Sequence, residues 1–72
     1  MLGYPLKTIL NTIESRHGHE AVIQTLAAAG LPADRFYRLN EPYPDSEAQR
    51  LTAAAFLHLS VEDIAEAFLR TR

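Results

Sequence analysis

The chain has 72 residues, with seven Lys or Arg, nine Asp or Glu, and no cysteine. A chain of this length forms one domain, residues 1–72, and its own hydrophobic core is small. The formal net charge of −2 argues against a nucleic-acid-binding protein, because such proteins carry a basic face. The absence of cysteine excludes disulfides and zinc sites that use thiolates.

The sequence also argues against a membrane protein. No apolar run approaches the roughly 20 residues that a membrane-spanning helix needs. The first residues lack the basic and apolar regions of a secretory signal peptide. We therefore expect a cytoplasmic protein whose partners are neither nucleic acids nor membranes.

The first half of the chain predicts two helices. Residues 5–17 form the first, and Pro5 suits its first turn, where the missing N–H costs nothing. Its apolar stripe, at helical spacing, consists of Leu6, Ile9, Leu10 and Ile13. Gly18 ends this helix. Residues 19–29 form the second helix, and Gly30 is the residue expected just after its end.

Residues 31–44 form a connector that is rich in proline and aromatic residues. A short extended piece at residues 36–39 is possible, but no second strand is evident to pair with it. Phe36, Tyr37 and Tyr43 are predicted either to fill the gap between the helix pairs or to form an exposed interface.

The second half predicts two more helices, at residues 46–58 and 61–71. Asp45 is the predicted N-cap of the third helix. Ser60 and Asp63 form a capping-box-like pair at the start of the fourth. The fold class is therefore all-α, with four short helices in two antiparallel pairs joined by the connector.

Histidines are the residues most suited to hold a metal or haem. His17 and His19 flank Gly18, and Glu14 lies one turn earlier, so a metal site and a pair of exposed histidines are both compatible with the sequence. His58 lies on the apolar side of the third predicted helix. It is a packing residue or, in the alternative, a haem ligand.

Catalytic motifs are not evident. Glu62, Asp63 and Glu66 form an acidic patch at the start of the last helix, which is the expected arrangement of a solvated helix end. No serine has the context of a nucleophile, and the glycines are too far apart for a phosphate-binding loop. We expect neither an enzyme nor a metal site.

Several short motifs follow one another along nearly the whole chain. They are Met1 and Gly3, Gly18, Gly30-Leu31-Pro32, Tyr37, Tyr43-Pro44-Asp45, Ser60-Val61-Glu62-Asp63-Ile64 and Ala67-Phe68. In order and spacing they resemble the N-terminal helical region of the haem-based nitric oxide/oxygen-binding (H-NOX) family. The chain departs from that pattern at Leu69, where the family usually has glycine.

The resemblance implies the helical distal subdomain of a gas sensor. The family's proximal histidine and its Tyr-x-Ser-x-Arg motif have no counterpart here, so this chain alone is not expected to ligate haem. The implied function is regulation in signalling, by docking to a protein partner or by self-association as a homodimer. The expected core or interface residues are Leu6, Ile9, Leu10, Ile13, Phe56 and Phe68. The alternatives are direct haem and nitric oxide sensing through His58, and a purely structural helical domain.

Overall fold

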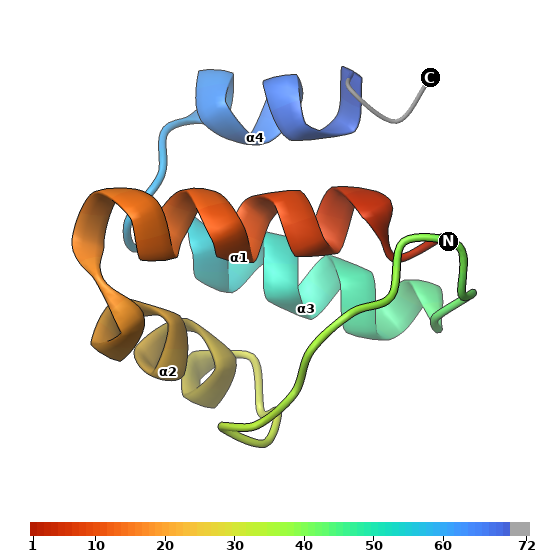
Figure 1. Cartoon of the computed structure of the whole chain (residues 1–72), viewed down its shortest axis with the longest axis horizontal. Coiled ribbons are helices and arrows are strands. Elements are labelled where there is room, and N and C mark those ends of the chain that lie inside the picture. The colour runs from red at the N-terminus through yellow and green to blue at the C-terminus, as the bar shows by residue number, and fades with distance from the viewer. Residues whose placement is uncertain (70–72) are drawn as a thin grey trace.

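The computed structural model describes residues 1–69 and confirms the all-α fold class (Figure 1). Its helices are α1 (Tyr4–His17), α2 (His19–Ala28), α3 (Asp45–Ala55) and α4 (Val61–Leu69). The predicted extension of the last helix to residue 71 lies outside the described residues. Within residues 1–69, no helix is both long and apolar enough to cross a membrane.

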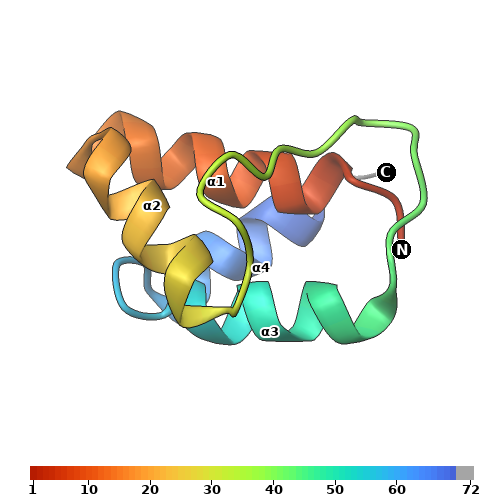
Figure 2. The ribbon, with the colours of Figure 1, turned by 90° about the horizontal axis from the view of Figure 1, so that it is seen from below.

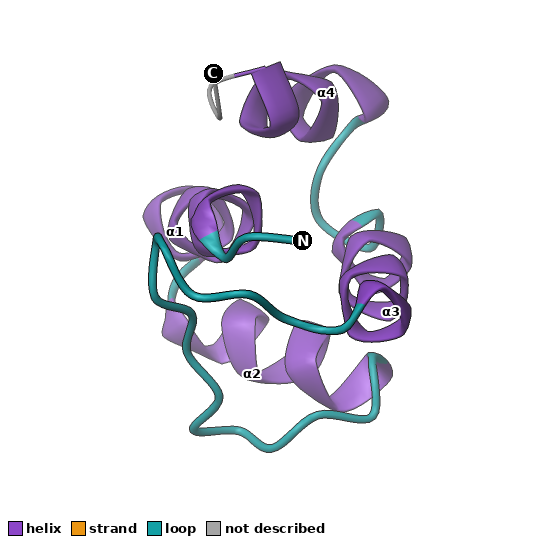
Figure 3. Ribbon diagram, turned by 90° about the vertical axis from the view of Figure 1, so that its right-hand side faces the viewer, coloured by secondary structure: helices purple, strands orange, loops and turns teal. Residues whose placement is uncertain are grey.

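Helix α1 is the centre of the arrangement, because it packs against each of the other three helices. Helices α1 and α3 lie side by side and run in the same direction, whereas α4 lies above α1 in the view of Figure 1 and runs in the opposite direction (Figures 1 and 2). Viewed along α1 and α3, α2 is seen crossing beneath them (Figure 3). Helix α4 packs mainly against α1. The predicted pairing of α4 with α3 is therefore not the main contact of α4.

Two glycines shape the ends of the first helices. Gly18 joins α1 to α2 with φ 91° and ψ 172°, a conformation that is essentially restricted to glycine. Gly30 has φ 73° and follows α2. The Gly30 N–H donates to the Ala27 carbonyl at 3.0 Å, and the Leu31 N–H donates to the Leu26 carbonyl at 2.9 Å. These bonds form a Schellman motif, which satisfies the last carbonyls of α2.

We predict that Gly18→Ala destabilises the fold by about 1–3 kcal/mol, because an L-residue is strained at this φ and ψ. A Cβ at this position meets no neighbouring atom within 4 Å, so backbone conformation alone is responsible. Urea unfolding of synthetic chains measures the effect. D-alanine at position 18 is the control: it accepts a positive φ and should leave stability at or above that of the natural chain. Equal losses with both enantiomers would contradict the explanation.

The third helix ends at Ala55, so its predicted extension to residue 58 is wrong. The N–H groups of Phe56, Leu57 and His58 each donate to the carbonyl three residues earlier, at 3.1–3.3 Å. This tighter 3₁₀-type pattern is common at helix ends. As a result, His58 lies on a turn between α3 and α4 and not on a helix face.

The predicted caps of the last two helices have different outcomes. At α4, Ser60 Oγ accepts from the Asp63 N–H at 3.2 Å, and Asp63 Oδ2 accepts from the Ser60 N–H at 3.1 Å, which confirms the capping pair. At α3, the N-cap is Pro44, and Asp45 is already helical. The Asp45 carboxylate instead accepts a hydrogen bond from the Met1 amino group at 3.2 Å.

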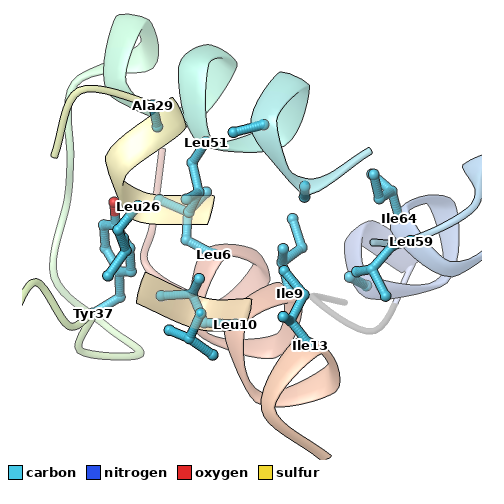
Figure 4. Packing of buried hydrophobic residues seen from close by; sticks show 14 of the residues in the cluster. Leu6, Ile9, Leu10, Ile13, Leu26, Ala29, Tyr37, Leu51, Leu59 and Ile64 are labelled. Atoms are coloured by element: carbon cyan, nitrogen blue, oxygen red, sulfur yellow. The ribbon is translucent and has the colours of Figure 1, made fainter. Parts of the chain in front are cut away.

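The core lies where the four helices meet (Figure 4). All four residues of the predicted first-helix stripe are buried. The other large side chains of the core are Val22, Leu26, Tyr37, Leu51, Leu59 and Ile64. Each large aliphatic side chain stabilises the fold by about 1.5–3 kcal/mol when fully buried. Tyr43 and Phe68 are partly buried against this cluster.

The connector runs past the N-terminal residues and pairs with them. Leu2 and Pro42 form an isolated antiparallel bridge. The Tyr43 N–H donates to the Met1 carbonyl at 2.7 Å, and the Gly3 N–H donates to the Glu41 carbonyl at 3.0 Å. The bridged residue Pro42 lies outside the extended piece considered at residues 36–39, and its partner was not predicted because the three residues before α1 are too few to show a strand pattern.

Candidate functional site

A partly buried ion pair fixes the connector to α3. Arg35 donates from Nε to Glu47 Oε2 and from Nη2 to Glu47 Oε1, both at 3.0 Å. Tyr37 Oη donates to the same Oε2 at 2.7 Å. Tyr37 is 1% exposed and Glu47 is 8% exposed, so both lie in the interior. A bidentate arginine–carboxylate pair of this kind has a defined geometry as well as strength.

Aromatic stacking completes this cluster. The Tyr37 and Tyr43 rings meet edge to face with centroids 4.7 Å apart. The Arg35 guanidinium lies 5.4 Å and 5.3 Å from their centroids, within the range of cation–π attraction. The Arg38 N–H donates to Tyr43 Oη at 2.9 Å. Tyr37 and Tyr43 therefore fill space in the interior, as one of the two predicted roles for the connector aromatics has it. Phe36 does not, because it is 65% exposed.

The protonation states of the cluster follow from these contacts. Burial raises the pKa of Glu47, but hydrogen bonds from Tyr37 and Arg35 lower it by more, so that pKa lies below its ordinary value of 4.5. Burial, together with the Glu47 carboxylate, raises the pKa of Tyr37. Glu47 is therefore ionised and Tyr37 neutral at physiological pH. Tyr37 and Glu47 are buried and hydrogen-bonded within the cluster, and Arg35, whose side chain is 33% exposed, is engaged by Glu47, so the cluster holds the connector on α3.

The sequence alone does not predict this cluster, and it marks neither Glu47 nor Arg35 as a site residue. Nothing in the local pattern marks the pair, because its members lie on a connector and a helix 12 residues apart. The nearest signal is that Glu47, Ala48 and Leu51 lie close together at helical spacing, which places a carboxylate beside the buried side of α3.

The histidines do not converge on a metal site. His17 Nε2 lies 3.1 Å from the His58 carbonyl oxygen, and the two rings are 5.5 Å apart. His19 Nδ1 lies 3.0 Å from a Glu14 carboxylate oxygen on the surface. Among residues 1–69, no three His, Asp or Glu side chains are arranged to hold a metal ion.

The position of His58 does not suit a haem ligand. Its Nε2 is buried and has no hydrogen-bond partner, so an iron atom cannot approach it from solvent. The His17 ring lies beside the His58 ring, tilted by 39° with centroids 5.5 Å apart. The grooves described among residues 1–69 are lined by other side chains. His58 acts here as a packing residue of the turn between α3 and α4.

Apolar side chains are concentrated at the surface around α4. An open groove of about 540 Å³ separates one side of α3 from the C-terminal part of α4. Its apolar lining comes from Met1, Ala48, Ala53, Phe56 and Phe68. Phe56, which lines the groove, is 49% exposed. Further exposed apolar side chains lie on the turn before α4 and on α4 itself: Leu57 is 64% exposed, Val61 69% and Leu69 58%. Patches of this kind commonly mark interaction sites.

Comparisons of the chain with protein-family models, with curated proteins and with solved structures find no match. The H-NOX resemblance therefore stays a prediction from the short motifs. Function has to be argued from the residues of this chain and their arrangement.

Proposed function

We propose that this chain is a helical docking module of the H-NOX-like type, which acts in signalling by binding a protein partner or a second copy of itself. The observation that supports this function is the apolar surface of α4, the preceding turn and the adjoining groove. A domain with a purely structural role would gain stability by covering these side chains with polar residues or with the rest of its own chain.

Catalysis is not part of the proposal. The polar cluster of Arg35, Tyr37 and Glu47 is satisfied internally. The surface histidines face a carbonyl oxygen and a carboxylate, and neither arrangement activates a nucleophile. Docking requires none of these groups, and it uses the apolar surface that the fold leaves open.

The test against direct gas sensing is a titration of the purified chain with haem, in the reduced state, before and after addition of nitric oxide. We expect no saturable one-to-one Soret shift, because His58 Nε2 is closed to the surface. A saturable shift that responds to nitric oxide and disappears in His58→Ala would overturn the docking proposal in favour of direct sensing. His19→Ala is the matched control, since His19 is exposed and its ring lies 3.0 Å from a Glu14 carboxylate oxygen.

A further inference from the structure

A second groove, of about 240 Å³, is bordered by α1, α2 and residues 33–37 of the connector, three segments that can be followed in Figure 3. We call it the α1–α2 groove. The lining residues that bear on its chemistry are Lys7, Leu10, Asn11, Val22, Asp34 and Phe36. None of its lining residues comes from α3 or α4, so it is separate from the apolar surface on which the proposed docking function rests.

The floor of the α1–α2 groove is apolar. Leu10 and Val22 belong to the hydrophobic core and also line the groove. Phe36 borders the same space and is 65% exposed, so the fold leaves much of this ring in water. An aromatic ring placed in the groove would contact the floor and cover part of Phe36, and pairs of aromatic rings attract each other in offset or edge-to-face arrangements.

Some of the charged side chains that line the groove are already engaged within the chain. The Arg35 guanidinium lies 2.8 Å from a Glu47 carboxylate oxygen, as described above. A Glu14 carboxylate oxygen lies 3.0 Å from His19 Nδ1. These contacts leave the groove with one cation and one anion that have no partner in the described part of the chain.

The cation is Lys7 and the anion is Asp34. Within residues 1–69, neither side chain forms an ion pair, and the Asn11 amide makes no hydrogen bond. Lys7 and Asn11 are four residues apart on α1, so they are neighbours on one face of the helix. Adjacent ammonium and amide N–H donors suit a carboxylate, whereas Asp34, on the connector, suits an ammonium group.

The volume of the groove limits the size of an occupant. A cavity of about 150 Å³ holds a benzene ring, and pockets for drug-sized molecules have about 300–1,000 Å³. At about 240 Å³, the α1–α2 groove therefore suits a single ring with a short polar chain. That is the size of one aromatic amino acid.

We propose that the α1–α2 groove binds a free aromatic α-amino acid. The ring lies on the apolar floor beside Phe36, the carboxylate accepts hydrogen bonds from Lys7 and Asn11, and the ammonium group donates to Asp34. A ligand with a carboxylate alone would meet the charge of Asp34, and one with an ammonium group alone would meet that of Lys7, so the pair selects a zwitterion. This binding activity goes beyond the proposed docking function and does not depend on it.

Titration of the purified, isotopically labelled chain with L-phenylalanine, followed by amide chemical shifts, tests the proposal. We expect saturable binding with a dissociation constant of about 0.1–1 mM, and the largest shifts at Asn11, Val22 and Phe36. Phenylpropionate, which lacks the ammonium group, and phenethylamine, which lacks the carboxylate, should each bind about fivefold more weakly or worse.

Two substitutions test the assignment of the charges. Lys7→Gln should weaken L-phenylalanine and phenylpropionate but not phenethylamine, whereas Asp34→Asn should weaken L-phenylalanine and phenethylamine but not phenylpropionate. Arg38→Gln and Glu41→Gln are the matched controls, because they remove the same two charges from an exposed ion pair outside the groove. Circular dichroism checks that all four variants stay helical.

The absence of saturable L-phenylalanine binding overturns the proposal, and so do shifts confined to α3 and α4. N-acetyl-L-phenylalaninamide carries neither charge. If it binds as tightly as L-phenylalanine, the groove takes an aromatic side chain of a peptide and the free amino acid is the wrong ligand. Equal effects of Lys7→Gln on all three probes would contradict the carboxylate contact assigned to Lys7.

Discussion

Glu47→Ala should destabilise the fold by about 2–3 kcal/mol, a large part of the stability of so small a domain. The substitution leaves the buried Tyr37 hydroxyl without its acceptor and removes both hydrogen bonds from Arg35. The penalty is less than for a fully buried ion pair, because the Arg35 side chain is 33% exposed and recovers some hydration. Urea unfolding followed by circular dichroism measures the loss.

Two controls isolate the cause of that loss. Glu41→Ala removes an exposed ion pair with Arg38, whose closest atoms are 3.6 Å apart, and should change stability by less than about 0.5 kcal/mol. Tyr37→Phe keeps the ring and the Arg35–Glu47 pair but removes one hydrogen bond, so it should cost about 1 kcal/mol. Similar losses from Glu41→Ala and Glu47→Ala would contradict the role assigned to the buried cluster.

The same carboxylate makes stability depend on pH. Because the pKa of Glu47 is lower in the folded chain than its ordinary value of 4.5, the folded state favours the ionised form. The stability that the ionised Glu47 carboxylate contributes is present above pH 4.5 and is lost as the pH falls through the folded-state pKa of Glu47. In Glu47→Ala, the loss of stability on acidification should therefore be smaller than in the natural chain. A parallel decline in both would mean that other carboxylates dominate.

The sequence predicts the helices well, since their signals are local. Pro5, Gly18 and Gly30 mark helix ends through backbone conformation, and the stripe from Leu6 to Ile13 marks the buried side of α1. The end of α3 was misplaced because Phe56 and Leu57 continue an apolar pattern that suits a helix. In the structure they belong to a 3₁₀-type turn between α3 and α4. Helical spacing alone cannot show that change.

Contacts between segments that are distant in the sequence could not be predicted from it. The Arg35–Glu47 pair and the bridge between Leu2 and Pro42 join segments without a shared local pattern. The exposed side of α4 is a different case. Val61, Ala65 and Leu69 are visible in the sequence, but a stripe of apolar residues is usually read as core. Only the packing of Ile64 and Ala67 on α1 shows that the other stripe is left open.

Gly3→Ala should also be among the most damaging single substitutions, with a loss of about 2–3 kcal/mol. Gly3 has an ordinary φ of −74°, so the restriction is space rather than backbone conformation. A Cβ at Gly3 would collide with the Arg38 carbonyl oxygen and would lie 2.7 Å from a ring carbon of Tyr43. The carbonyl belongs to the connector backbone, so it cannot rotate away as a side chain would.

Relief of that collision requires the connector to move from the N-terminal residues. The hydrogen bonds of the Gly3 and Tyr43 N–H groups then weaken, and the Tyr43 ring loses its position beside Tyr37 and Arg35. Urea unfolding measures the energy, and amide hydrogen exchange at Gly3 and Tyr43 should accelerate more than exchange in α2. Leu2→Ala is the control, since Leu2 is 52% exposed and should cost less than about 0.5 kcal/mol. Unchanged exchange at Tyr43 in Gly3→Ala would show that the connector tolerates the methyl group, and that Gly3 is not needed for its close approach.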